Sequence, residues 1–161
     1  MKKKNIVFVC HGNICRSTMA EFLFCDRAKK MGIADRFSIS SRATSTEELG
    51  NPVHPGTRRV LDRLGIDSSG KYATQITKRE CNEADLIIVM DRNNARNLRP
   101  FIGENGHKVF PLLSFAGEDR DISDPWYTGN FEETYRDVVL GLDGLMKFLC
   151  SKTKGEENET F

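Results

Sequence analysis

The stretch that decides the fold spans residues 6–17 and reads Ile-Val-Phe-Val-Cys-His-Gly-Asn-Ile-Cys-Arg-Ser. Its first four residues are apolar, which is typical of a short buried strand. After it, apolar residues recur every three or four positions as far as Met31, which is the spacing of one helix face. The pattern therefore predicts that Cys10 ends a strand and that Arg16 begins a helix.

The short loop between Cys10 and Arg16 is suited to hold a small anion. A helix N-terminus offers unpaired N–H groups and the positive end of a dipole, and the same field favours a thiolate over a thiol. Arg16 adds a planar set of donors that matches two phosphate oxygens. A nucleophile in a phosphate cradle predicts phosphoryl transfer through a cysteinyl-phosphate. The alternative is a buried strand cysteine followed by an ordinary turn.

Three further residues of the run favour the cradle. Gly12 and Asn13 both tolerate the left-handed backbone that a tight anion-binding loop requires. Ser17 follows the arginine directly, and its hydroxyl can donate a hydrogen bond to the Cys10 thiolate. We therefore expect Ser17 to stabilise the sulfur as a leaving group.

The residues at both ends of the chain match one family. The motif Val-Cys-x-Gly-Asn-x-Cys-Arg-Ser at 9–17, with Met-Ala-Glu at 19–21, resembles the low-molecular-weight protein tyrosine phosphatases. That family also carries an Asp-Pro-aromatic motif near its C-terminus, where this chain has Asp-Pro-Trp at 124–126. The resemblance covers residues 4–150. It implies hydrolysis of phosphotyrosine in protein substrates, with no metal and no organic cofactor.

The resemblance implies a role for each catalytic residue. Cys10 attacks phosphorus in line, and Arg16 holds the equatorial oxygens with the loop amides. Asp124 protonates the leaving phenolate and later deprotonates the attacking water, so we expect a rate optimum on the acidic side. The nearby carboxylates of residues 118, 119 and 121 are alternatives for this acid. The residues expected to contact substrate are His11, Gly12, Asn13, Ile14, Cys15, Ser17, Trp126 and Tyr127.

Some of these residues have a second interpretation. His11 either tunes the thiolate or points away from it. Trp126 and Tyr127 either wall a deep pocket that admits an aromatic phosphate or pack on their own loop. Cys15 either forms a reversible disulfide with Cys10, as the resemblance favours, or fills buried space.

Three positions depart from the family pattern. Thr18 stands where most members have proline, which is favourable but dispensable in a first helical turn. Lys71 stands where many members have a histidine that supports the loop asparagine, and lysine cannot accept a hydrogen bond. Glu47 lies near the position of a pocket-rim tryptophan, so substrate preference does not carry over from the family.

Length and composition agree with a small enzyme. The chain has 161 residues, 39% of them hydrophobic, and a formal net charge of +1, which argues against a nucleic-acid-binding protein. No apolar run approaches the length of a membrane span or a signal peptide. Five cysteines without paired spacing favour a reducing cytoplasm, although export without a recognisable signal stays open. We expect a monomer or a weak dimer.

Strand and helix patterns alternate along one domain, residues 1–150, before a polar tail at 151–161. Besides the first strand, we expect strands at 37–40, 86–90 and 108–110, with helices between them and a long last helix over 135–149. Thr77 and Glu80 have the spacing of a capping box. The prediction is an α/β fold, a four-stranded parallel sheet with helices on both faces and a phosphate-binding loop after the first strand.

Three other functions remain to be weighed. Thiol-dependent arsenate reduction uses a similar cradle with a further cysteine pair, whereas Cys81 stands alone in that region. Phosphoarginine phosphatases resemble this chain but tend to have threonine in place of Ile14, and an apolar residue suits a phenyl ring better. A phosphate-binding module without catalysis would need neither the nucleophile nor the acid.

Overall fold

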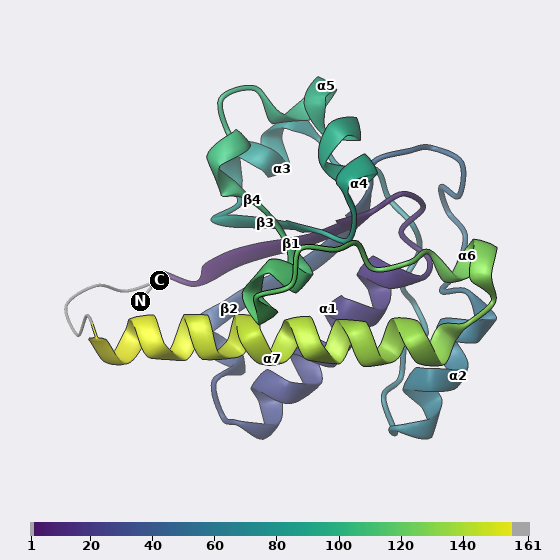
Figure 1. Cartoon of the computed structure of the whole chain (residues 1–161), viewed down its shortest axis with the longest axis horizontal. Helices are drawn as coiled ribbons and strands as arrows, with labels where there is room; N and C mark the ends of the chain where they lie inside the picture. Colours follow the sequence, from purple (N-terminus) through teal and green to yellow (C-terminus); the bar gives the residue numbers. More distant parts are fainter. Residues whose placement is uncertain (1, 156–161) are drawn as a thin grey trace.

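A computed structural model describes residues 2–155 of the chain and consists of one sheet with helices around it (Figure 1). The strands are β1 (Lys4–Cys10), β2 (Phe37–Ala43), β3 (Leu86–Val89) and β4 (Val109–Pro111). The helices are α1 (Arg16–Lys30), α2 (Pro55–Arg63), α3 (Lys78–Glu83), α4 (Arg92–Asn97), α5 (Arg99–Ile102), α6 (Pro125–Thr128) and α7 (Phe131–Gly155). Three 3-10 turns are η1 (Ala34–Arg36), η2 (Gly106–Lys108) and η3 (Leu112–Ala116).

The four strands form one parallel sheet in the order β2-β1-β3-β4, which confirms the predicted fold class. Strand β1 lies in the interior of the sheet, between β2 and β3. After β1 the chain adds β2 on one side of it within the sheet, and later adds β3 and β4 on the opposite side, so the strand order reverses at β1. In open sheets of this kind, ligands bind beyond the carboxyl end of the strand where the order reverses. Cys10 lies at that end of β1.

The alternation of side chains along β1 divides the core into two layers. Ile6, Phe8 and Cys10 pack with apolar residues of α1, α2 and α7 on one face. Val7 and Val9 pack with residues of α3 and of the segment around α4 and α5 on the other face. Figure 1 shows these two groups of helices on opposite sides of the sheet. Burial on both faces explains why β1 is an uninterrupted apolar run.

Two elements are longer than the sequence predicted. Strand β2 continues to Ala43, because its residues stay in register with β1 until Ala43 pairs with Cys10. Helix α7 begins at Phe131 and continues past Ser151, where we expected the tail, to Gly155. No proline or glycine interrupts the chain between Ser151 and Gly155. The rest of the predicted tail, 156–161, lies outside the described residues.

Helix α7 packs so closely against the segment after β4 that the backbones of the two are in contact. A Cβ atom on Gly144 would lie 2.1 Å from the carbonyl oxygen of Phe115 in η3, so only glycine fits there. This contact fixes the start of the segment that leads from η3 to α6. Although α7 has 25 residues, no helix within residues 2–155 is both long and apolar enough to cross a membrane.

Candidate active site

Residues 11–15 form a tight loop between β1 and α1. Asn13 has φ 61°, so it adopts the left-handed backbone that its short polar side chain tolerates. Gly12 does not adopt it, contrary to our expectation. Gly12 instead permits a close approach, because a Cβ atom there would lie 3.2 Å from Cγ of Glu48. The Thr18 hydroxyl donates to the carbonyl of Cys15, 3.0 Å away, inside the first turn of α1.

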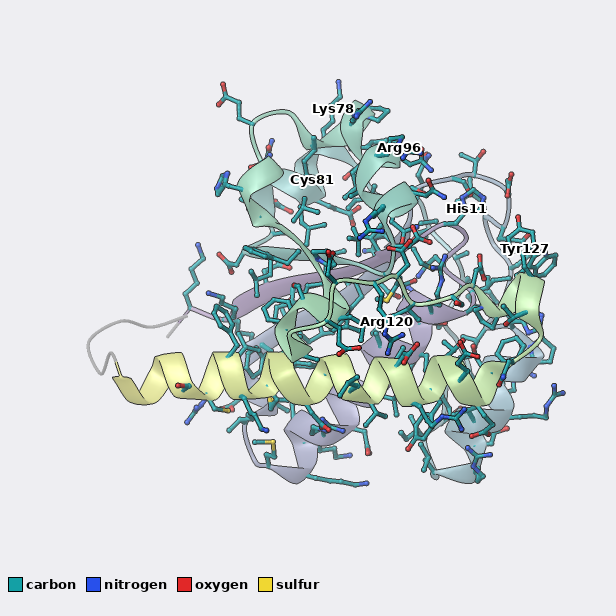
Figure 2. All side chains as sticks on the ribbon, viewed as in Figure 1. His11, Lys78, Cys81, Arg96, Arg120 and Tyr127 are labelled. Atoms are coloured by element: carbon teal, nitrogen blue, oxygen red, sulfur yellow. The ribbon has the colours of Figure 1, made fainter. Side chains whose placement is uncertain are left out.

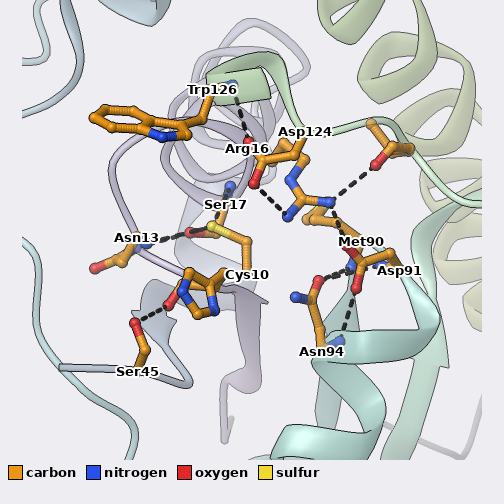
Figure 3. A network of polar contacts seen from close by, with 12 residues as sticks. Cys10, Asn13, Arg16, Ser17, Ser45, Met90, Asp91, Asn94, Asp124 and Trp126 are labelled. Atoms are coloured by element: carbon orange, nitrogen blue, oxygen red, sulfur yellow. Dashed lines mark hydrogen bonds and ion pairs between the residues drawn. The ribbon is translucent and has the colours of Figure 1, made fainter. Parts of the chain in front are cut away.

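Donors converge on the sulfur of Cys10 (Figure 3). The backbone N–H groups of Asn13 and Ser17 donate to Sγ over 3.3 and 3.4 Å. The Ser17 hydroxyl lies 3.0 Å from the same atom and can donate when the sulfur is ionised. These three groups are arranged to stabilise a negative charge on Cys10.

Asn13 is held by groups from three other parts of the chain. Its Nδ2 donates to the hydroxyl oxygens of Ser17 at 2.8 Å and Ser41 at 2.9 Å. Its Oδ1 accepts from the backbone N–H of Thr74 at 3.2 Å. The loop asparagine is therefore fully engaged without a histidine at position 71. Sequence reasoning missed Ser41, which lies on β2 and reaches the loop only through strand pairing.

Lys71 supports this arrangement from behind. Its Nζ donates to the backbone carbonyl of Ser41 at 3.0 Å and lies 3.6 Å from Oε1 of Glu21. The Ser41 hydroxyl donates to the same Glu21 oxygen. Burial lowers the pKa of Lys71, and the opposing charge of Glu21 partly offsets that effect. A chain of polar contacts thus runs from Lys71 through Ser41 and Asn13 to the cysteine.

The guanidinium of Arg16 is buried and lies between two carboxylates. Its Nη1 donates to Oδ2 of Asp91 at 2.7 Å and to the carbonyl of Ile122 at 2.9 Å. Its Nη2 donates to Oδ2 of Asp124 at 3.3 Å. Burial opposes the charge, but the neighbouring Cys10, Asp124 and Asp91 outweigh it and raise the pKa of Arg16.

One donor of Arg16 is unused. Its Nε is buried and has no hydrogen-bond partner among the residues that the structure describes. A buried donor without a partner is costly, so such a group calls for a ligand that completes it. Because Arg16 lines a pocket together with Cys10, an oxygen of a bound anion in that pocket fits this requirement.

Asp91 both caps a helix and anchors the arginine. Its Oδ1 accepts from the backbone N–H of Asn94 at 2.7 Å, and Oδ1 of Asn94 accepts in return from the N–H of Asp91 at 3.1 Å (Figure 3). This capping box begins α4. The other oxygen of Asp91 remains free to hold Arg16. Sequence reasoning missed the bond to Arg16, which joins residues 75 positions apart.

Asp124 is the acidic residue of its loop that reaches the pocket. It caps α6, with Oδ1 accepting from the backbone N–H of Trp126 at 3.0 Å. Pro125 follows at the first helical position and restricts the backbone of Asp124 to extended conformations. The three alternative carboxylates do not line this pocket. Their partners are Arg120 for Glu118 and Arg92 for Asp119 and Asp121.

The pocket above the cradle contains about 490 Å³ of empty space, including the solvent at its mouth. It is lined by Cys10, His11, Gly12, Ile14, Cys15, Arg16, Glu47, Glu48, Asp124, Trp126 and Tyr127. His11 and Tyr127 belong to opposite ends of the chain, and both lie at this end of the molecule (Figure 2). Asn13 and Ser17 are not part of the lining. They are buried behind it, where they hold the sulfur.

The walls differ in character. Ile14 and Cys15 are buried, and burial together with the charge of Cys10 raises the pKa of the Cys15 thiol. Trp126 is partly supported by His54, whose ring lies 5.7 Å away edge-on and stacks on Phe131. Tyr127 is exposed. His11 points to the mouth, where its Nε2 lies 2.6 Å from Oε2 of Glu47. A polar floor with aromatic and aliphatic walls suits a phosphate ester of an aromatic ring.

Comparison with known sequences agrees with this geometry. The model of the family described as low molecular weight phosphotyrosine protein phosphatase matches residues 5–155. The low molecular weight protein-tyrosine-phosphatase YfkJ of Bacillus subtilis is 38% identical over 145 residues, which cover 88% of this chain and 93% of that protein. The low molecular weight protein-tyrosine-phosphatase PtpA of Staphylococcus aureus is 35% identical over 154 residues, or 95% of this chain and 98% of that protein.

Solved structures show the same likeness. The crystal structure of Bacillus subtilis YfkJ superposes with a TM-score of 0.89 at 36% identity, covering 99% of both chains. A low molecular weight protein tyrosine phosphatase from Streptococcus pyogenes superposes with a TM-score of 0.82 at 39% identity. That comparison covers 97% of this chain and 99% of the other.

Proposed function

The chain belongs to the low molecular weight phosphotyrosine protein phosphatase family, and we propose that Cys10, Arg16 and Asp124 carry out its phosphatase reaction on phosphotyrosine. Members of this family are cysteine-dependent and metal-independent and react through a cysteinyl-phosphate. The observation that carries the assignment is the buried, unpartnered Nε of Arg16 in the same pocket as Cys10. It supports a phosphate bound directly above the sulfur.

In the first step, the Cys10 thiolate attacks phosphorus opposite the ester oxygen. The S–P bond forms as the P–O bond breaks, and the leaving phenolate takes a proton from Asp124. Arg16 and the N–H groups of the loop hold the equatorial oxygens, where charge must be stabilised during the transfer. The Ser17 hydroxyl and the backbone N–H of Asn13 stabilise the negative charge on the sulfur.

In the second step, water attacks the phosphorus of the cysteinyl-phosphate. Asp124, now ionised, accepts the proton of the water, and the S–P bond breaks to release inorganic phosphate and the thiolate. Asp124 therefore acts first as an acid and then as a base within one turnover.

The lining supports phosphotyrosine over its alternatives. Ile14 places an apolar side chain beside the path of the ester group, and Trp126 adds an aromatic surface to the wall. A phenyl ring can pack on both, whereas a short phosphoserine leaves them uncovered and a guanidinium would lose its solvation against Ile14. Tyrosine-phosphorylated proteins are the partners that this pocket favours.

The test is phosphate release from matched phosphotyrosine, phosphoserine and phosphoarginine peptides, with reduced enzyme and a metal chelator. We expect turnover of phosphotyrosine by the wild type and none by Cys10→Ser. Cys25→Ser, at an exposed cysteine of α1, is the matched control and retains activity. Absence of turnover by the reduced wild type, or retained turnover in Cys10→Ser, would contradict the assignment.

A further inference from the structure

Two glutamates define the electrostatics of the pocket mouth. Glu47 and Glu48 lie in the segment between β2 and α2, and both line the pocket that contains Cys10 and Arg16. Neither belongs to the phosphate cradle. Both come from a separate segment of the chain that faces the same pocket.

Glu47 is held in place and remains accessible. Its Oε2 lies 2.6 Å from Nε2 of His11, and its backbone N–H donates to the hydroxyl of Ser45 at 3.4 Å. The Glu47 side chain is nevertheless 67% exposed. One carboxylate oxygen therefore contacts the histidine, and the group as a whole faces the solvent from which substrate arrives.

Glu48 lies closer to the cradle. Its Cγ packs against Gly12, and its Oε1 accepts from Nδ2 of Asn51 at 3.0 Å. Its charge is felt inside the pocket, because it adds to the rise that burial and neighbouring charges cause in the pKa of Cys15. A carboxylate in this position repels an approaching anion and attracts a cation.

Apart from the His11 ring, which contacts Glu47, little opposing charge is present at the mouth. Within residues 2–155, the one guanidinium in the lining belongs to Arg16, which is buried at the floor and already bonded to Asp91 and Asp124. Among the described residues that line the pocket there is no lysine. Burial is the main cause of the lowered pKa of His54, and the charge of Arg59 on α2 adds to it. Arg59 itself is not part of the pocket lining.

We propose that Glu47 and Glu48 select phosphotyrosines that have lysine or arginine next to them in the sequence. The proposal rests on the proposed function, because the unpartnered Nε of Arg16 fixes where the phosphate binds. With the phosphate on the floor, the tyrosine ring fills the pocket and its Cα lies at the mouth. The side chains before and after it then lie beside the two carboxylates, and a basic side chain there finds an opposite charge.

The effect is moderate because the mouth is open to solvent. Two unit charges about 7 Å apart at an effective dielectric constant near 60 attract by enough to change affinity roughly three- to fourfold. Exchanging lysine for glutamate replaces attraction by repulsion, so we expect a preference of about tenfold at low salt. It falls as salt rises, since the Debye length is only about 4 Å near 0.5 M salt.

The experiment compares two phosphotyrosine peptides that differ only at the residues flanking the phosphotyrosine, lysine in one and glutamate in the other. Phenyl phosphate serves as a substrate without flanks. For the wild type we expect kcat/KM to favour the lysine peptide about tenfold, mainly through KM, with a smaller ratio near 0.5 M salt. Equal rates on the two peptides, or a preference for glutamate, would overturn the proposal. Failure to hydrolyse phenyl phosphate would instead overturn the proposed function.

Variants assign the preference to the two residues. Glu47→Gln combined with Glu48→Gln keeps the size of both side chains and removes both charges. We expect the ratio between the peptides to drop to about twofold or less. Glu104→Gln, an exposed glutamate outside this pocket, is the matched control and keeps the wild-type ratio. An undiminished ratio in the double variant would show that other groups read the flanking charge.

Discussion

Arg16 at the floor of the pocket is 2% exposed and donates hydrogen bonds to Asp91, Ile122 and Asp124, which all follow β3 in the sequence. Trp126 and Tyr127 at the mouth are, by contrast, 56% and 82% exposed. The floor is a network in which nearly every polar atom has a partner. The side chains at the mouth are more exposed and make few polar contacts with the rest of the protein.

The difference separates chemistry from selection. A group that must meet the transition state within a fraction of an ångström needs rigid support, and the floor supplies it through Asn13, Ser41 and Asp91. A group that only favours one substrate over another can be exposed and replaced. We therefore expect substitutions at the floor to reduce kcat and substitutions at the mouth to change KM.

The largest effect is expected from Arg16→Lys. Lysine keeps the charge but loses the planar donors, so the contacts to Asp91, Asp124 and the phosphate are not all made at once. We expect kcat on phenyl phosphate to fall by about 100- to 1,000-fold, with an unchanged fold by circular dichroism. A loss confined to KM would show that the floor serves binding alone.

A smaller effect is expected from Lys71→Met, which removes the cation behind the network and keeps a side chain of similar length. Ser41 and Glu21 lose a partner, so Asn13 is held less firmly. We expect kcat to fall by about three- to tenfold with little change in KM, equivalent to about 1 kcal/mol in the barrier. An unchanged kcat would show that Ser41 and Asn13 support catalysis without the contact from Lys71.

The same variant has a signature in stability against pH. Because burial lowers the pKa of Lys71 below its ordinary value of 10.5, the unfolded chain binds more protons at this site between the two values. The contribution of Lys71 to the free energy of unfolding therefore rises with pH in that window. Thermal unfolding measured as the pH rises toward 10.5 should show the wild type gaining stability relative to Lys71→Met.

The smallest effect on kcat is expected from Trp126→Ala at the mouth. The ring lines the pocket and packs edge-on against His54, but it holds none of the catalytic groups with its side chain. We expect KM for a phosphotyrosine peptide to rise by about three- to tenfold, as loss of one aromatic contact implies, and kcat to stay within twofold. A fall in kcat as large as that of Arg16→Lys would remove the distinction between floor and mouth.

The central part of the site could be predicted from sequence because it is local. Strand, loop and helix follow one another within residues 6–17, and the helix N-terminus brings its own donors to Cys10. The parallel sheet was predictable for a similar reason, since apolar runs buried on both faces differ clearly from helical spacing. Asp124 came from the family motif rather than from any local pattern.

What could not be predicted depends on contacts between distant segments. The bond from Arg16 to Asp91 joins residues 75 positions apart, and Ser41 reaches Asn13 only because β2 extends in register beside β1. Gly12 was misread because its close neighbour, Glu48, comes from another loop. Composition and periodicity describe single segments, so they do not contain these pairings.

The dependence of Arg16 on later segments has a consequence for synthesis on the ribosome. Asp124 lies 108 positions after Arg16, which at about 5–20 residues per second corresponds to roughly 5–20 s of translation. During that interval the nascent chain carries Cys10 and Arg16 without the carboxylate that we propose as the acid. The nucleophile therefore emerges from the ribosome before the proposed reaction is possible, which requires that residue 124 has also been made.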